Sequence, residues 1–128
     1  MSASAMSTSQ YGRSPSQSGD LLLPGRQRAP VVCLLHGGFW RMPHGREQWR
    51  PVAQDLVGHG FAVWNLGYRR IGEAGGGWPG TLDDIVAGVS HLGVLARDAA
   101  LDLRNVTLVG HSAGGHLALW AAAQRQAD

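Results

Sequence analysis

The 128-residue chain is long enough for one ordinary domain, and its 44% hydrophobic and 16% charged residues are typical of a folded globular protein. Its 11 basic residues, all arginine, are scattered and offset by nine acids, which excludes a clustered basic site for nucleic acid. No apolar run approaches the roughly 18 residues of a membrane span, and the single cysteine, Cys33, excludes an intrachain disulfide. Cys33 stands in the apolar run VVCLL, which predicts a buried thiol rather than a reactive one.

The N-terminal segment is polar and rich in serine. Residues 1–15 are expected to be a disordered tail, followed by one partial α/β domain over residues 16–128. The segment has no apolar core of the kind found in secretory signals, so a cytoplasmic location is the default expectation.

Short runs that are apolar at every position are separated by segments whose apolar residues recur with the period of a helix. The expected strands cover residues 19–25, at a sheet edge, and 31–35, 61–66 and 106–110. The expected helices cover residues 47–57, 81–95 and 113–125, with Thr81 as the N-terminal cap of the second. Strands that are apolar throughout indicate burial on both faces, so this order predicts a mostly parallel sheet with helices on both sides.

The motif Gly110-x-Ser112-x-Gly114 lies between the last expected strand and the last expected helix. This context is required for a nucleophile elbow, in which a serine sits on a sharp strand-to-helix turn. A side chain at either flanking position would collide with the neighbouring strand or helix, which explains the two glycines. The pattern predicts Ser112 as a catalytic nucleophile; the alternative is a purely structural turn.

A second motif, His36-Gly37-Gly38-Phe39-Trp40, directly follows the expected strand 31–35. Acyl transfer needs backbone N–H groups aimed at the oxyanion, and glycines let the backbone approach the substrate. The expected donors are the amides of Gly38, Phe39 and Ala113. His36 and Gly37 are expected to support the loop, and Gly110 and Gly114 to support the turn.

With both motifs in view, the chain resembles the N-terminal half of an α/β-hydrolase of the esterase/lipase type. The resemblance is strongest to the branch of kynurenine formamidase-like and acetyl esterase-like enzymes. The matching segments are HGGFW (36–40), YRR (68–70), WPGTLDDI (78–85) and GHSAGGHLALWAA (110–122). The resemblance implies a three-layer α/β-hydrolase-type fold and a serine hydrolase acting on a carboxylic ester or formamide through an acyl-enzyme.

The triad of this fold follows the order Ser, Asp or Glu, His. Here the sequence reaches Asp128 soon after Ser112, and no histidine follows His116. The expectation is therefore a fold truncated after the nucleophile helix, without the catalytic acid and base and with strand 106–109 as an exposed apolar edge. The alternative function is a catalytically inactive α/β fragment or interaction remnant.

The remaining residues predict no cofactor and no metal, because the histidines lack ligand spacing. A nucleotide-binding domain is disfavoured, because HGGFW differs from G-x-G-x-x-G. The expected partner is a small-molecule ester or amide, with no nucleic acid and no membrane, and the sequence leaves the oligomeric state open. Phe39, Trp40 and Trp78 are candidates either for an aromatic substrate pocket or for packing.

Overall fold

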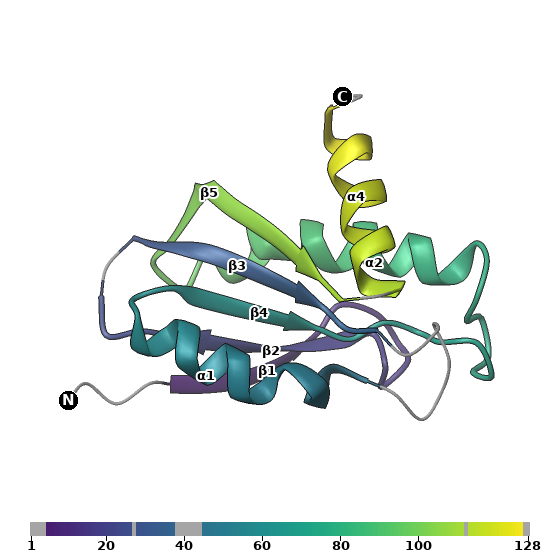
Figure 1. Cartoon of the computed structure of the whole chain (residues 1–128), viewed down its shortest axis with the longest axis horizontal. Coiled ribbons are helices and arrows are strands. Elements are labelled where there is room, and N and C mark those ends of the chain that lie inside the picture. Colours follow the sequence, from purple (N-terminus) through teal and green to yellow (C-terminus); the bar gives the residue numbers. More distant parts are fainter. Residues whose placement is uncertain (1–4, 27, 38–44, 112, 127–128) are drawn as a thin grey trace.

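The computed structural model describes residues 5–26, 28–37, 45–111 and 113–126. These residues form a mixed sheet flanked by helices on both faces (Figure 1). The strands are β1 (Ala5–Gln10), β2 (Ser18–Leu23), β3 (Ala29–Leu35), β4 (Ala62–Leu66) and β5 (Leu101–Gly110), in the spatial order β1-β2-β4-β3-β5. The helices are the 3₁₀ helix η1 (Arg46–Trp49), α1 (Arg50–Gly58), α2 (Gly80–Ser90), α3 (Leu92–Leu95) and α4 (Ala113–Gln126).

The centre of the sheet is parallel, as predicted: β3 pairs in parallel with β4 on one side and with β5 on the other. The N-terminal strands run the other way, since β2 is antiparallel to β4 and β1 is antiparallel to β2. The strand predicted at 106–110 begins earlier, at Leu101, and its pairing with β3 contains an irregularity between Pro30 and Val31.

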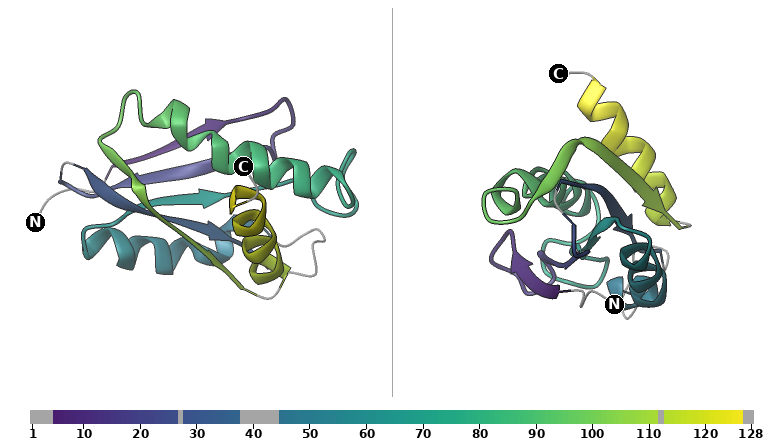
Figure 2. Two further views of the ribbon diagram at one scale, coloured as in Figure 1. Left: turned by 90° about the horizontal axis from the view of Figure 1, so that it is seen from above. Right: turned by 90° about the vertical axis from the view of Figure 1, so that its left-hand side faces the viewer.

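Both faces of β3 are buried, which explains its lack of hydrophobic alternation. Val31, Cys33 and Leu35 belong to the core on the side of α2, α3 and α4, whereas Val32 and Leu34 belong to the core on the side of α1. Figure 2 shows the sheet between α1 and the other helices. Cys33 has no exposed surface, and burial raises the pKa of its thiol to about 12, in agreement with the predicted packing role.

The N-terminal segment differs from the prediction. Residues 1–15 were expected to be disordered, but Ala5–Gln10 forms β1, and β2 lies inside the sheet rather than at its edge. The exposed Met6 shows that β1 gains little from apolar burial. Backbone pairing holds it, together with hydrogen bonds from the Thr8 hydroxyl to Asp20 Oδ1 (2.8 Å) and between Ser9 Oγ and His91 Nε2 (2.8 Å). Residues 1–4 lie outside the described residues.

The second predicted helix is present but is capped differently and is interrupted. It begins at Gly80, so Thr81 lies inside α2, and its hydroxyl accepts from the Gly77 N–H (2.9 Å) and donates to the Arg69 carbonyl (2.6 Å). The chain breaks the helix at His91, between α2 and α3. The predicted helix over 47–57 is likewise divided into η1 and α1. Within the described ranges, no helix is long and apolar enough to cross a lipid bilayer.

A buried carboxylate ties the loop after β4 to α2. Asp84 is 1% exposed and accepts hydrogen bonds from the Arg69 backbone N–H (2.8 Å), Nε (2.9 Å) and a terminal guanidinium nitrogen (2.8 Å). It also accepts from Gln17 Nε2 (2.9 Å), which belongs to the connection between β1 and β2. One carboxylate therefore fixes three segments that are far apart in the sequence.

The turn from β5 into α4 passes very close to the end of β3. A Cβ placed on Gly110 would overlap the carbonyl oxygen of Gly114, and one on Gly114 would overlap the carbonyl oxygens of Leu35 and His36. These obstacles are backbone atoms, which cannot rotate away. The steric reason predicted for the two glycines therefore holds in the structure.

Replacing Asp84 with alanine is expected to lower the free energy of unfolding by about 2 to 3 kcal/mol, because it leaves the Arg69 guanidinium without its buried partner. Urea denaturation measures this loss. Asp83→Ala is the matched control, since Asp83 is the adjacent but exposed residue of the same helix. Equal losses for the two variants would contradict the role given to Asp84.

Gly114→Ala is expected to destabilise the fold by about 2 kcal/mol or more, because the added methyl group meets backbone carbonyls. Gly115→Ala provides the comparison, since a Cβ there comes no closer than 3.4 Å to its nearest neighbour, the Gly110 carbonyl oxygen. Alanine at Gly115 should be neutral or slightly stabilising, because it is the better helix former. The melting temperatures of the two variants test this prediction. A Gly114→Ala variant that melts at the same temperature as the unaltered protein would refute the close contact.

Candidate functional site

The carboxyl ends of β3, β4 and β5 lie at one edge of the sheet because the three strands are parallel. In open α/β sheets this edge is where ligands bind. His36 follows β3, Gly67 and Tyr68 follow β4, and His111 follows β5. The two sequence motifs, about 75 residues apart in the chain, are thus brought to the same edge.

The described part of the chain contains all four predicted supporting residues, His36, Gly37, Gly110 and Gly114, but only one of the predicted catalytic and oxyanion-hole residues. Ser112, Gly38 and Phe39 lie outside the described residues, as does Trp40. Ala113 is the first residue of α4, which places its backbone amide in the first turn of that helix. The roles of these residues therefore stay predictions.

The supporting residues of the two motifs meet. Leu35 is the partner of Gly110 in the parallel ladder, and the His111 N–H donates to the Leu35 carbonyl (3.4 Å). Gly114 lies against the carbonyls of Leu35 and His36. The structure thus joins the turn that carries Ser112 to the strand end that leads into Gly37 and Gly38.

His36 is buried and stacked. It is 1% exposed, and its ring lies parallel to that of Tyr68 with centroids 4.0 Å apart. Its Nδ1 lies 3.0 Å from the Gly37 carbonyl oxygen, and because that oxygen only accepts, Nδ1 carries the proton. Burial lowers the pKa of His36 to about 4, so the ring is neutral at physiological pH.

Tyr68 fixes the same strand end from the other side. Its hydroxyl donates to the His36 carbonyl oxygen (2.7 Å), and burial raises the pKa of the phenol well above its usual value. Sequence reasoning noticed this tyrosine only as part of the YRR match. The available signal was its position directly after a buried strand, at the edge where the motifs meet.

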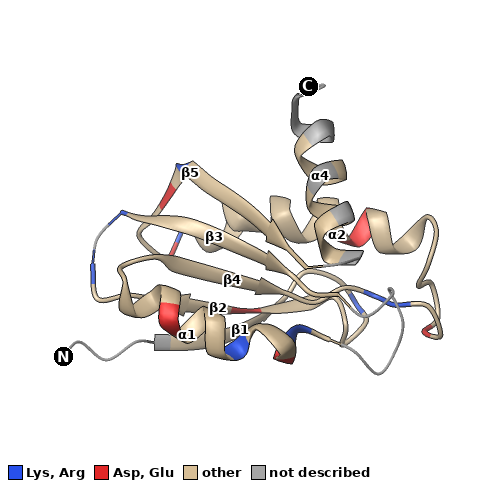
Figure 3. Cartoon of the chain, in the orientation of Figure 1, with Lys and Arg blue, Asp and Glu red and all other residues tan. Residues whose placement is uncertain are grey.

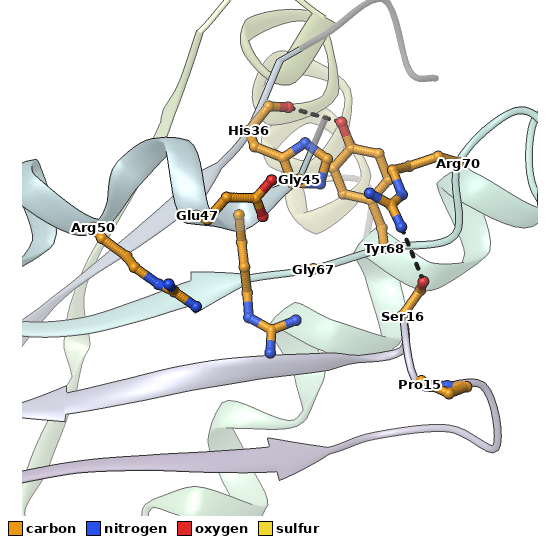
Figure 4. A pocket seen from close by; sticks show the side chains of 10 residues that line it. Pro15, Ser16, His36, Gly45, Glu47, Arg50, Gly67, Tyr68 and Arg70 are labelled. Atoms are coloured by element: carbon orange, nitrogen blue, oxygen red, sulfur yellow. Dashed lines mark hydrogen bonds between the residues drawn. The ribbon is translucent and has the colours of Figure 1, made fainter. Parts of the chain in front are cut away.

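A polar cavity of about 270 Å³ adjoins the His36–Tyr68 stack (Figure 4). It is lined from the helix side by Arg46, Glu47 and Arg50, and from the loop after β4 by Tyr68 and Arg70. No local sequence pattern predicts this cavity, because its charged residues come from separate segments. Trp78, a candidate for an aromatic pocket, is 83% exposed and lies on the surface.

The other histidines do not form a cluster within the described residues. His111 is exposed, and its ring lies edge-on to that of Trp49, with the ring centroids 6.5 Å apart. His59 is exposed at the end of α1, and His91 contacts Ser9. His44 lies outside the described residues. Among the described residues, no group of three or more His, Cys, Asp or Glu side chains is placed to hold a metal ion.

Comparisons with known proteins agree with this architecture. Esterase LipQ of Mycobacterium tuberculosis is 32% identical over 101 residues, which are 79% of this chain and 23% of that protein. Kynurenine formamidase of Salmo salar is 30% identical over 110 residues, covering 84% of this chain and 35% of that protein. The chain therefore spans about a quarter to a third of the length of these relatives.

Solved structures show the same fold. An inhibited esterase B from Lactobacillus rhamnosis superimposes with a TM-score of 0.84 and 32% identity, over 96% of this chain and 41% of that one. A bacterial heroin esterase superimposes with a TM-score of 0.82 and 22% identity, over 97% and 40% respectively. The fold is thus that of α/β-hydrolase esterases, as predicted. Because the sequence profile of the BD-FAE family also matches residues 20–128, the chain belongs to the BD-FAE family of this fold.

Proposed function

We propose that this chain carries the nucleophile and the oxyanion hole of a serine hydrolase that cleaves a carboxylic ester or a formamide. The observation that carries the proposal is the contact of Gly114 with the carbonyls at the end of β3. A nucleophile elbow and an oxyanion loop must adjoin for one carbonyl group to reach both, and the contact between Gly114 and the end of β3 supports such an arrangement. The similarity to esterases and to a formamidase supports the same chemistry.

In the proposed reaction, the Ser112 hydroxyl attacks the substrate carbonyl carbon and forms a tetrahedral intermediate. The backbone amides of Gly38, Phe39 and Ala113 donate to its oxyanion, and the positive end of the α4 dipole adds to this stabilisation. Collapse of the intermediate expels the alcohol or amine and leaves an acyl-enzyme. Water then attacks the acyl-enzyme, which releases the acid and restores the serine.

A general base must accept the serine proton, and His36 is unsuited to this task. Its ring is buried and stacked on Tyr68, and burial lowers its pKa to about 4, which makes it a weak base. The proposal therefore gives His36 and Tyr68 the task of holding the strand end that leads into the oxyanion loop. It assigns the general base and its acidic partner to residues outside the 128-residue chain.

Fluorophosphonate labelling tests the nucleophile. In the protein translated from the complete reading frame, peptide mass spectrometry is expected to find the probe on Ser112, and Ser112→Ala should abolish labelling. Ser90→Ala, at an exposed position in α2, should leave labelling unchanged. The 128-residue chain alone should react at least about 10³-fold more slowly, because the proposal places the general base outside it. Labelling that survives Ser112→Ala, or a folded protein that does not react, would reject the proposal.

The support role of His36 predicts a pH dependence of stability. The unfolded histidine has a pKa near 6.5, and the folded one about 4, so the unfolded state binds more protons between these values. The contribution of neutral His36 to the free energy of unfolding is complete above pH 6.5. It declines by about 2 to 3 kcal/mol as the pH falls toward 4. Urea unfolding at pH 7 and pH 4 measures it.

The matched comparison is His36→Gln, which should remove this part of the pH dependence, whereas His59→Gln, at an exposed position, should retain it. If the His36 variant follows the pH profile of the unaltered protein, His36 does not titrate as a buried neutral residue.

A further inference from the structure

The polar cavity beside His36 is lined by more arginines than carboxylates, and Figure 3 shows basic residues near the start of α1 and in the loop after β4. Its lining includes three arginines, Arg46, Arg50 and Arg70, against one carboxylate, Glu47. Figure 4 shows Arg50 reaching toward the cavity from the side of α1, and Arg70 from the loop after β4 on the opposite side. The two titratable rings of the wall, His36 and Tyr68, are neutral because burial lowers the pKa of His36 and raises that of Tyr68. Arg46 and Arg70 are ion-paired with Asp20 and Glu73, but neither carboxylate is among the lining residues, so an anion in the cavity meets the guanidinium groups before it meets those carboxylates.

The carboxylates behind two of these arginines are already engaged. Asp20 accepts from the Thr8 hydroxyl and from Arg46 Nε (3.1 Å). Glu73 accepts from the Ser16 hydroxyl and from Arg70 Nε (2.6 Å). These contacts hold the two guanidinium groups at the cavity wall. A guanidinium has five N–H donors, and the bonds from Arg46 to Asp20 and Ser18 use three of its own.

Arg50 differs from the other two. It is exposed at the start of α1, and it makes no salt bridge within the described part of the chain. It lies four residues after Arg46, and both residues line the cavity. Arginine is suited to planar carboxylates, which can accept two parallel N–H bonds.

The cavity also adjoins the motif that the proposed function uses. His36 and Tyr68 form part of its wall, and the His36 carbonyl lies against the first turn of α4 through Gly114. The cavity volume of about 270 Å³ exceeds that of several water molecules at roughly 30 Å³ each, so a small organic acid fits.

We propose that this cavity is a binding site for a small carboxylate, held by Arg50 together with Arg46 and Arg70. The inference rests on the proposed function in one respect: the carboxylate is either the acidic part of the hydrolase's own substrate or a separate organic acid bound next to the oxyanion loop. Both sources share the same recognition chemistry.

Nuclear magnetic resonance titration of the ¹⁵N-labelled 128-residue chain tests the site with three probes: propionate, monomethyl succinate and the neutral dimethyl succinate. Both anionic probes are expected to shift the Arg50 Nε–H signal and the amides of Gly45 and Gly67, and dimethyl succinate is not. Arg50→Gln should weaken the binding of both anions about ten-fold, because a charge-assisted donor is lost. Arg50→Lys, which keeps the charge but not the planar fork, should give an intermediate loss.

The matched control is Arg97→Gln, which removes an exposed arginine that is not part of the cavity wall. Equal weakening by the Arg50 and Arg97 variants, or equally strong binding of dimethyl succinate, would overturn the proposal. Shifts of the His111 and Gly114 amides with monomethyl succinate but not with propionate identify the carboxylate as part of a substrate. Shifts confined to the cavity with both anions identify a separate acid.

This test is independent of the hydrolase chemistry, because neither binding nor its loss requires Ser112. A serine that does not react with the fluorophosphonate would leave the carboxylate site standing. Conversely, a chain that binds no carboxylate would leave the nucleophile assignment untouched.

Discussion

The close approach of α4 to the end of β3 is the constraint on which the rest of the site depends. At Gly110 and Gly114 the space for a Cβ is already taken by backbone carbonyl oxygens, so the turn exists only with glycine at both positions. That approach lets the His111 N–H reach the Leu35 carbonyl and brings a helix N-terminus to the edge of the sheet. The N-terminus of α4 at this edge is therefore the place where negative charge is best accommodated.

Buried polar groups then hold the surrounding loops, where hydrophobic packing alone would leave them poorly defined. The Tyr68 hydroxyl fixes the His36 carbonyl, and Asp84 fixes the backbone of Arg69, the next residue along the chain. Consecutive residues of the loop after β4 thus anchor it to β3 and to α2. The Tyr68 hydroxyl and the Asp84 carboxylate both have hydrogen-bond partners, so these two groups fix the loop geometry at small energetic cost.

The predicted and unpredicted parts of the structure differ in their physical origin. The parallel strands could be predicted because burial on both faces leaves a continuous apolar run such as that of Val31 to Leu35. The paired glycines could be predicted because the elbow requires them. β1 could not, because backbone pairing and hydroxyl contacts of residues such as Thr8 hold it without an apolar pattern. The same reason applies to Thr81, whose hydroxyl bonds to a distant loop, and to the arginine-lined cavity, since neither leaves a signal in local sequence.

The two outer strands give the sheet chemically different borders. Along β1 three of the six residues bear a hydroxyl group and a fourth is glutamine, and polar residues at a strand border discourage further pairing. β5, at the opposite border within the described residues, is rich in aliphatic side chains, and Val109 among them is 37% exposed. A strand contributed by any other polypeptide segment would therefore gain apolar contacts beside β5 and few beside β1.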